Sequence, residues 1–286
     1  MRRRELVGLL GSAALWPLAA RAQQRMPAIG FLHNESITAI RLEVFAFWKG
    51  MEKVGLTEHR NIAVEYRWAD GRYELLPSLA MDLVRQDVAA IVVGGGDKSV
   101  MAVKQVTGTI PIVFVSGSDP VRSGIVASLS RPGGNITGIS VASTELLARR
   151  LEVLHELAPQ LGITALVNPG NTSITVQLQY LTEAAKRMGI PIQIVNAAGE
   201  ADFGLALDEV AQRRETALLV ANDGFLNGQR DRLVALTTRY AIPAAFGNRE
   251  FVEAGGLMSY GPSLVEAYRQ AGIYVGRILK GEKSGD

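Results

Sequence analysis

The sequence contains no cysteine and only three histidines, which excludes several kinds of site. Without cysteine there is no disulfide, no thiolate metal ligand, no thiol nucleophile and no cysteine-linked lipid anchor. The histidines, His33, His59 and His155, are far apart in the sequence, which argues against a histidine metal cluster. We therefore expect neither a metal nor a cofactor.

Familiar enzyme motifs are also missing. The triplet Gly94–Gly96 does not match the dinucleotide-binding fingerprint, and the chain has neither a phosphate-binding P-loop nor a Gly-x-Ser-x-Gly nucleophile elbow. The helical pairs Arg149-Arg150 and Arg213-Arg214 are interpreted as solvated basic faces. These observations favour a protein that is not an enzyme, and an exported α/β enzyme remains the least favoured alternative.

The first 22 residues have the pattern of an export signal. Arg2, Arg3 and Arg4 precede the apolar stretch Leu6–Ala19, which is too short to span a membrane, and an Ala-x-Ala sequence follows at residues 20–22. Cleavage is expected before Gln23, giving a periplasmic protein without a lipid anchor.

Removal of this leader changes the charge of the chain. The leader holds four of the 30 basic residues and one of the 28 acidic residues, so the mature chain carries 26 and 27 and a net charge of −1. Because no basic excess remains, nucleic-acid binding is not expected.

Short apolar runs alternate with longer amphipathic stretches along the rest of the chain, and the series restarts near Pro159–Gly162. The expected strands or extended pieces are Ala28–Leu32, Asn61–Arg67, Ala89–Val93, Pro111–Val115, Gly138–Val141, Thr164–Val167, Pro191–Val195, Ala217–Val220, Pro243–Phe246 and Leu257–Ser259. The expected helices are Thr38–Val54, Leu75–Arg85, Ser99–Val106, Ile125–Leu129, Thr144–Leu157, Val176–Met188, Phe203–Arg213, Leu226–Tyr240 and Ser263–Leu279. Two successive βαβ series predict an α/β protein with two doubly wound parallel-sheet lobes.

Polar loops follow the expected strands, at the edge where parallel sheets bind ligands. They are rich in Gly, Ser, Asn and Asp, which allow close backbone approach and hydrogen bonding to a small polar solute. An aspartate could hold an ammonium group, and an aromatic ring could stack on an apolar one. For any one of these residues a helix cap is the commoner explanation, as in Asp119-Pro120, and the set of loops is more persuasive than any single residue. The candidate ligand-binding residues are Ser36, Gly96, Asp97, Ser116, Ser118, Asp119, Asn168, Asp223, Phe225 and Tyr260.

The chain resembles the periplasmic ABC-transporter substrate-binding proteins whose better-known members bind aromatic amino acids such as tryptophan. Two segments are fairly specific for this family: Arg131–Gly138 (RPGGNITG) and Gly255–Pro262 (GGLMSYGP). One segment departs from it, because Gly96-Asp97-Lys98 carries charges where many relatives have small neutral residues. Weaker matches are Glu65–Gly71, Ile110–Val115 with Asp119-Pro120, Leu166–Pro169 and Tyr274–Gly281.

The resemblance implies a type I periplasmic binding protein with two lobes joined by a hinge. It places a signal peptide at 1–22, lobe 1 at 23–140 plus 261–286, and lobe 2 at 141–260, with hinge strands near Gly138–Val141 and Leu257–Tyr260. It also implies a small-molecule solute, an ABC permease in the inner membrane as partner, and a monomer. Presentation of the ligand to a sensor or chemoreceptor is the alternative output.

Overall fold

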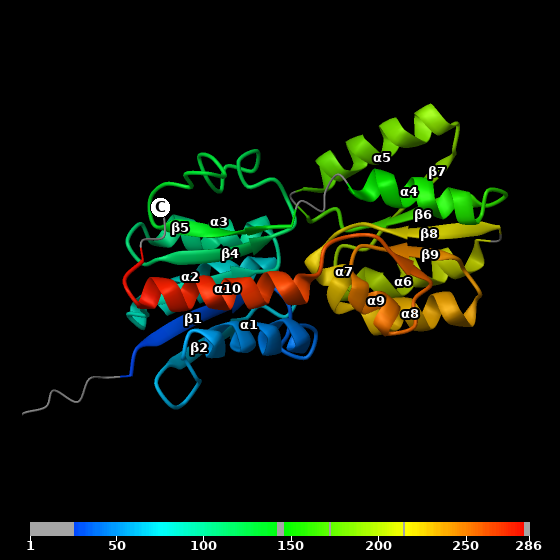
Figure 1. Ribbon diagram of the computed structural model, residues 1–286. Coiled ribbons are helices and arrows are strands. Elements are labelled where there is room, and N and C mark those ends of the chain that lie inside the picture. The colour runs from blue at the N-terminus through cyan, green and yellow to red at the C-terminus, as the bar shows by residue number, and fades with distance from the viewer. Residues whose placement is uncertain (1–25, 142–145, 172, 214, 283–286) are drawn as a thin grey trace, which may run out of the picture.

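The computed structural model describes residues 26–141, 146–171, 173–213 and 215–282, which form two parallel β-sheets side by side (Figure 1). The first sheet has the order β2-β1-β3-β4-β5 and the second has the order β10-β9-β8-β6-β7. Strand pairing is parallel throughout both sheets. The predicted leader, 1–22, lies outside the described residues.

The first sheet is covered by helices on both faces. Its strands are β1 (Ala28–His33), β2 (Ala63–Trp68), β3 (Ala90–Gly94), β4 (Ile112–Ser116) and β5 (Ile136–Ser140). Its helices are α1 (Arg41–Lys53), the 3₁₀ turn η1 (Tyr73–Leu75), α2 (Leu76–Arg85) and α3 (Asp97–Val106). Since both faces are buried, β1, β3 and β4 are apolar runs rather than alternating strands, as expected for a parallel sheet.

The second sheet repeats this arrangement. Its strands are β6 (Gly162–Val167), β7 (Ile192–Asn196), β8 (Thr216–Val220), β9 (Ala244–Phe246) and β10 (Met258–Ser259). Its helices are α4 (Leu146–Leu157), α5 (Ile174–Met188), α6 (Glu200–Gln212), α7 (Gly224–Gly228), α8 (Arg230–Arg239) and α9 (Arg249–Glu253). Two separate parallel sheets, each covered by helices on both faces, confirm the predicted fold class.

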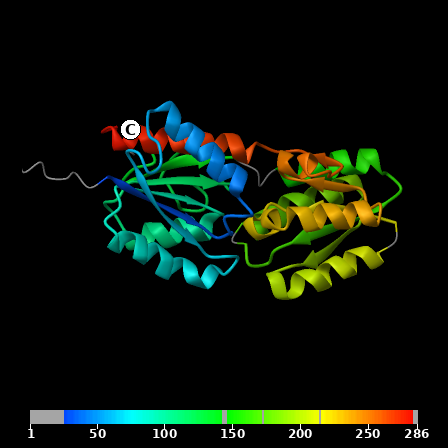
Figure 2. The ribbon, with the colours of Figure 1, turned by 90° about the horizontal axis from the view of Figure 1, so that it is seen from below.

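The last helix, α10 (Leu264–Leu279), returns to the first sheet and packs against α1, as both ribbon views show (Figures 1 and 2). Glycines allow the two helices to approach closely. A Cβ atom on Gly50 would overlap the carbonyl oxygen of Arg269, and one on Gly272 would overlap that of Phe47. The chain thus passes from the first sheet to the second after β5 and back again after β10.

Two expected helices differ from the observed ones. Ile125–Leu129 is not a helix, because Gly124 has φ +72° and the segment folds as turns that bury Ile125 and Val126. The expected helix Leu226–Tyr240 is divided at Gln229 into α7 and α8. In these two segments, the spacing of apolar residues correctly indicated side chains that contact the core. It did not indicate whether the backbone forms one continuous helix.

Candidate functional site

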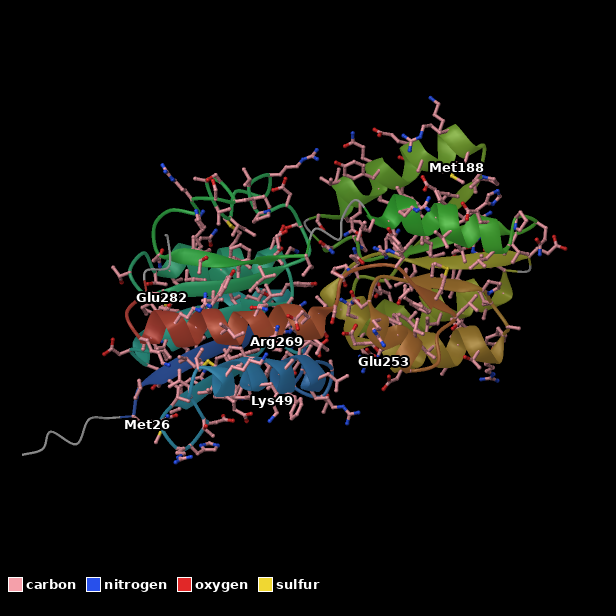
Figure 3. All side chains as sticks on the ribbon, in the orientation of Figure 1. Met26, Lys49, Met188, Glu253, Arg269 and Glu282 are labelled. Carbon is pink, nitrogen blue, oxygen red and sulfur yellow. The ribbon has the colours of Figure 1, made fainter. Side chains whose placement is uncertain are left out.

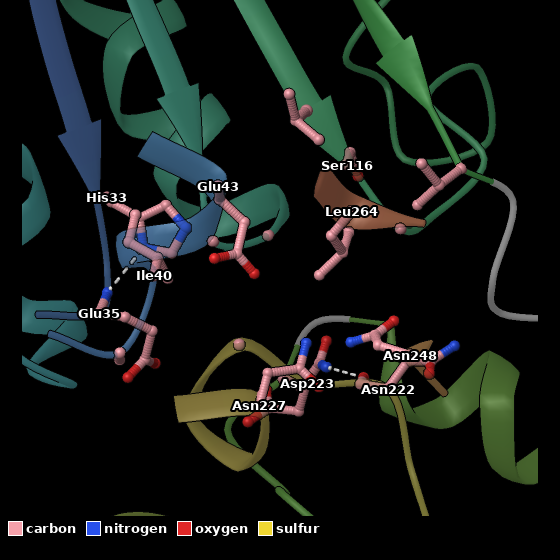
Figure 4. A pocket seen from close by; sticks show the side chains of 18 of the residues that line it. His33, Glu35, Ile40, Glu43, Ser116, Asn222, Asp223, Asn227, Asn248 and Leu264 are labelled. Atoms are coloured by element: carbon pink, nitrogen blue, oxygen red, sulfur yellow. Dashed lines mark hydrogen bonds between the residues drawn. The ribbon is translucent and has the colours of Figure 1, made fainter. Parts of the chain in front are cut away.

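The carboxyl ends of the two sheets face a common cleft of about 930 Å³, including the part open to solvent. Side chains from both sheets line this cleft, and Figure 4 shows the carboxylate of Glu43 pointing into it opposite Asn248 and Asn227. Parallel strands place their following loops at this edge, so residues distant in sequence meet here. Of the predicted ligand-binding residues, those lining the cleft are Gly96, Asp97, Ser116, Ser118 and Asp223.

Asp97 is held by two hydroxyl groups from the end of β4. The Oγ atoms of Ser116 and Ser118 each donate a hydrogen bond of 2.6 Å to Asp97 Oδ1. Asp97 is the first residue of α3, where the helix dipole favours a negative charge. This cluster is therefore pre-organised within the first sheet's half of the cleft.

Asp223 is the corresponding buried acid of the second sheet. It accepts hydrogen bonds from Asn168 Nδ2 (3.0 Å) and from the backbone N–H of Leu226 (3.0 Å), which caps α7. Burial raises the pKa of Asp223, although these donors act against the shift. The hydroxyl of Tyr73, from the first sheet's half, also donates to Asp223 over 3.4 Å and so bridges the cleft.

The other five predicted residues are not among the side chains that line this cleft. Ser36 accepts a hydrogen bond from the N–H of Ala39 (3.3 Å) in the turn before α1, and Asn168 lies behind Asp223. Phe225 is buried against Phe203, with ring centroids 5.6 Å apart.

The last two of these residues lie near the surface. Asp119 accepts hydrogen bonds from the N–H groups of Val121 (2.9 Å) and Arg122 (3.2 Å), and it borders a separate cavity. Tyr260 is 44% exposed directly after β10. In this conformation, Asp119 therefore acts as a turn cap and Tyr260 is a surface residue.

Several cleft residues were not among the sequence candidates. Glu35 is in the same loop as Ser36 and Asn222 precedes Asp223, so the strand-end rule could have found both. Asn171 and Ser173 likewise lie in the loop after β6. Other charged or amide residues of the cleft lie on helices or in a short element that the apolar pattern did not predict; they are Glu43, Gln177, Asn227, Arg230, Asn248 and Glu250.

His33 lies at the end of β1 and lines the cleft as a neutral side chain. Burial lowers the pKa of His33 to about 3. Its Nδ1 atom accepts a hydrogen bond of 3.0 Å from the backbone N–H of Glu35. His33 therefore fixes the start of this loop and contributes no positive charge to the cleft.

Arg150 is fully buried, so the interpretation of Arg149-Arg150 as a solvated pair is wrong for this residue. Its Nη1 atom donates to the carbonyl of Val220 (2.9 Å) and its Nη2 atom donates to Asn222 Oδ1 (2.8 Å). Burial lowers the pKa of Arg150 to about 9. The guanidinium group positions Asn222, one residue before Asp223.

Three glutamates of the cleft are only 5% exposed and have one carboxylate oxygen without a hydrogen-bond partner: Glu35, Glu43 and Glu250. Burial, followed by the charges of Asp223 and Asp70, raises the pKa of Glu35 well above its ordinary value. Burial is also the main cause that raises the pKa of Glu43 to about 7; Glu250 adds to the shift and Arg230 opposes it. The raised pKa values of Glu35 and Glu43 mean that these two carboxyl groups favour a proton or a cation beside them.

Two further classes of site were sought in the described part of the chain. It contains no cluster of three or more His, Asp or Glu side chains arranged to hold a metal ion. In the same residues, none of the helices combines the length and the apolar character that a membrane crossing requires.

Residues 30–286 match the family model of the ABC transporter substrate binding proteins, and the chain belongs to this family. A tyrosine-binding protein of Clostridioides difficile (strain R20291) is 23% identical over 241 residues, which cover 84% of this chain and 69% of that protein. The relatives are thus binding proteins rather than enzymes.

Solved structures share the fold. A conserved domain protein from Vibrio cholerae superposes with a TM-score of 0.80 at 23% identity. An ABC domain in complex with L-Trp from Streptococcus pneumoniae has a TM-score of 0.78 at 19% identity. Each comparison covers 91% of this chain and 87% of the other, so the type I architecture extends over both sheets.

Proposed function

We propose that this protein is the extracytoplasmic receptor of an ABC importer and binds a small amino-acid-like or carboxylate solute between two lobes. The observation that carries the proposal is the cleft itself, because acidic, amide and hydroxyl side chains from both sheets line it. A solute that touches both halves binds the closed form better than the open form and so shifts the population toward closure. The closed form would then deliver the solute to a permease in the inner membrane.

The moving bodies are proposed to be lobe 1 (23–140 plus 261–286) and lobe 2 (141–260). Direct contacts between the halves support a closed conformation. Tyr73 reaches Asp223, and Arg122 Nη1 donates to the hydroxyl of Tyr180 over 3.4 Å. Each of the four apolar core clusters lies within one half, so opening would leave these clusters intact.

Closure is testable with fluorescent dyes because the chain has no native cysteine. Met81→Cys on α2 and Leu205→Cys on α6 place one dye on each half at exposed positions. Energy transfer between the dyes should change when a panel of amino acids and small carboxylates is added. A second pair, Phe45→Cys with Met81→Cys, lies within one half and should not respond. The proposal fails if no solute in the panel binds or changes the first pair.

Export is proposed from the leader, with a monomeric mature protein free in the periplasm. Amino-terminal sequencing of the protein recovered from the periplasmic fraction should begin at Gln23. Recovery of an uncleaved chain in the membrane fraction would contradict the proposed location.

A further inference from the structure

The cleft is strongly acidic, although the mature chain is almost neutral. Among the described residues that line it, five are aspartate or glutamate, Arg230 is the one arginine or lysine, and His33 is neutral. Arg230 is itself paired with Asp231, its Nε atom lying 3.3 Å from Oδ1. A solute of net negative charge would therefore meet an excess of like charge in this cleft.

Within the part of the chain that the structure describes, hydrogen bonds account for two of the five carboxylates. Asp97 accepts two serine hydroxyls, and Asp223 accepts Asn168, Tyr73 and a backbone N–H. The other three, Glu35, Glu43 and Glu250, are 95% buried and each leaves an oxygen without a partner. A buried carboxylate without a donor is costly, so these oxygens indicate a missing hydrogen-bond donor.

The unpartnered carboxylates belong to two pairs, each with one member from each half of the molecule. Glu43 on α1 and Glu250 on α9 line the same cleft from opposite halves, and the charge of Glu250 acts on Glu43. Glu35, after β1, has its carboxylate beside Gly228 of α7, and it lines the cleft together with Asp223, after β8, whose charge acts on it. When the cleft closes without a ligand, like charges therefore approach each other in both pairs. A cation between the two carboxylates of a pair would replace this repulsion with attraction.

The aromatic side chains that line the cleft are buried and pack against other aromatic rings of the core. Phe251 stacks on Phe246 with centroids 4.4 Å apart, and Tyr268 stacks on Phe31 at 6.2 Å. Both residues are at most 3% exposed. Charge, rather than stacking on an aromatic solute, is therefore the dominant chemical property of this cleft.

We infer that the solute carries two ammonium groups, one received by Glu43 and Glu250 and the other by Glu35 and Asp223. Each ammonium group has three N–H donors, which suits a site formed by two carboxylates. The inference rests on the proposed receptor function and specifies its solute class. Basic amino acids and simple diamines share this chemistry; Arg230 would hold the carboxylate of a basic amino acid.

Calorimetry at pH 7.5 tests the inference with ornithine, lysine and putrescine against tyrosine, tryptophan and succinate. At least one compound with two ammonium groups should bind at least about tenfold more tightly than each of the other three solutes. Binding of ornithine or lysine without putrescine identifies the amino-acid source. Binding of putrescine alone identifies the diamine source.

Variants test whether the solute binds to these particular carboxylates or responds only to the overall negative charge of the protein. Glu43→Gln and Glu250→Gln should each weaken binding of the preferred solute by about tenfold or more, because each removes one charge-assisted hydrogen bond. Glu52→Gln on α1 and Glu253→Gln on α9 are matched controls on the same helices. Both control residues form exposed pairs, with Lys49 and Arg249, and Figure 3 shows Glu253 at the surface. Their affinities should stay within about twofold of the parent value.

The outcomes distinguish this inference from the receptor function. If tyrosine, tryptophan or succinate binds and changes the dye signal while the three amines do not, the receptor function stands and the inference is overturned. If no solute binds, both fail. Equal weakening by Glu253→Gln and Glu250→Gln would also overturn the assignment of the pairs. A Gln variant that melts at or above the temperature of the parent protein is folded, which excludes misfolding as the cause of lost binding.

Discussion

Two acidic regions of one cleft are constructed in opposite ways. Asp97, Ser116 and Ser118 come from adjacent elements of the first sheet, and the hydroxyls satisfy the carboxylate without help from the other half. Glu43 and Glu250 come from different halves, repel each other, and each leaves an oxygen without a partner. The first region stabilises the first sheet's half of the molecule. The carboxylates of the second region are satisfied only when a positively charged group lies between them.

This difference explains how one cleft can be stable and still respond to a ligand. Acids paired within one half keep their hydrogen bonds as the halves separate, so they do not favour either the open or the closed form. Acids that meet across the cleft change their energy with closure. The free energy that a solute supplies to closure therefore depends mainly on the second region.

The largest expected effect is the pH dependence of stability. The pKa of Glu43 is raised by burial from 4.5 to about 7, so folding takes up a proton between these values. This destabilising contribution is absent below pH 4.5, grows as the pH rises, and reaches at most about 3 kcal/mol above pH 7. Thermal melting without ligand should therefore occur at higher temperature at pH 5.5 than at pH 8.

Glu43→Gln is the control for this effect, because an amide cannot titrate. Its melting temperature should vary less with pH between 5.5 and 8 than that of the parent. An identical pH profile in the parent and the variant would show that Glu43 is not the responsible group.

The second largest effect concerns Asp97. Its carboxylate stabilises the folded protein, whereas the ionised carboxylate of Glu43 in the same cleft destabilises it. Asp97→Ala leaves the buried hydroxyls of Ser116 and Ser118 without their acceptor and should lower the free energy of unfolding by about 2 kcal/mol. Urea denaturation measures this value. Asp119→Ala, which removes an exposed turn cap, should cost about 1 kcal/mol and is the comparison variant. No loss of stability in Asp97→Ala would contradict the division of the cleft into two regions.

Sequence reasoning predicted the fold and the first acidic region for the same physical reason. Parallel strands buried on both faces are recognisable as apolar runs, and the loops after them must lie at one edge of the sheet. Asp97, Ser116, Ser118 and Asp223 follow such runs directly, so the same rule placed them in the cleft.

The second acidic region could not be predicted in this way. Glu43 and Glu250 are in the first turns of helices, where glutamate is common for reasons of helix stability alone. Their proximity depends on how the two sheets are placed relative to each other, which neither periodicity nor spacing encodes. Arg150 was misjudged for a related reason: helical spacing does not reveal that the end of β8 supplies two acceptors for a buried guanidinium group.

The smallest expected effect tests the repulsion across the cleft directly. Glu250→Gln removes the charge that acts on Glu43 and should raise the free energy of unfolding at pH 8 by about 1 kcal/mol. Urea denaturation without ligand measures the change, with Glu253→Gln expected within about 0.5 kcal/mol of the parent protein. At pH 5.5, where Glu43 is largely protonated, the gain should become smaller. A gain that is independent of pH would indicate improved packing of the amide rather than relief of charge repulsion, and it would remove the electrostatic distinction between the two regions.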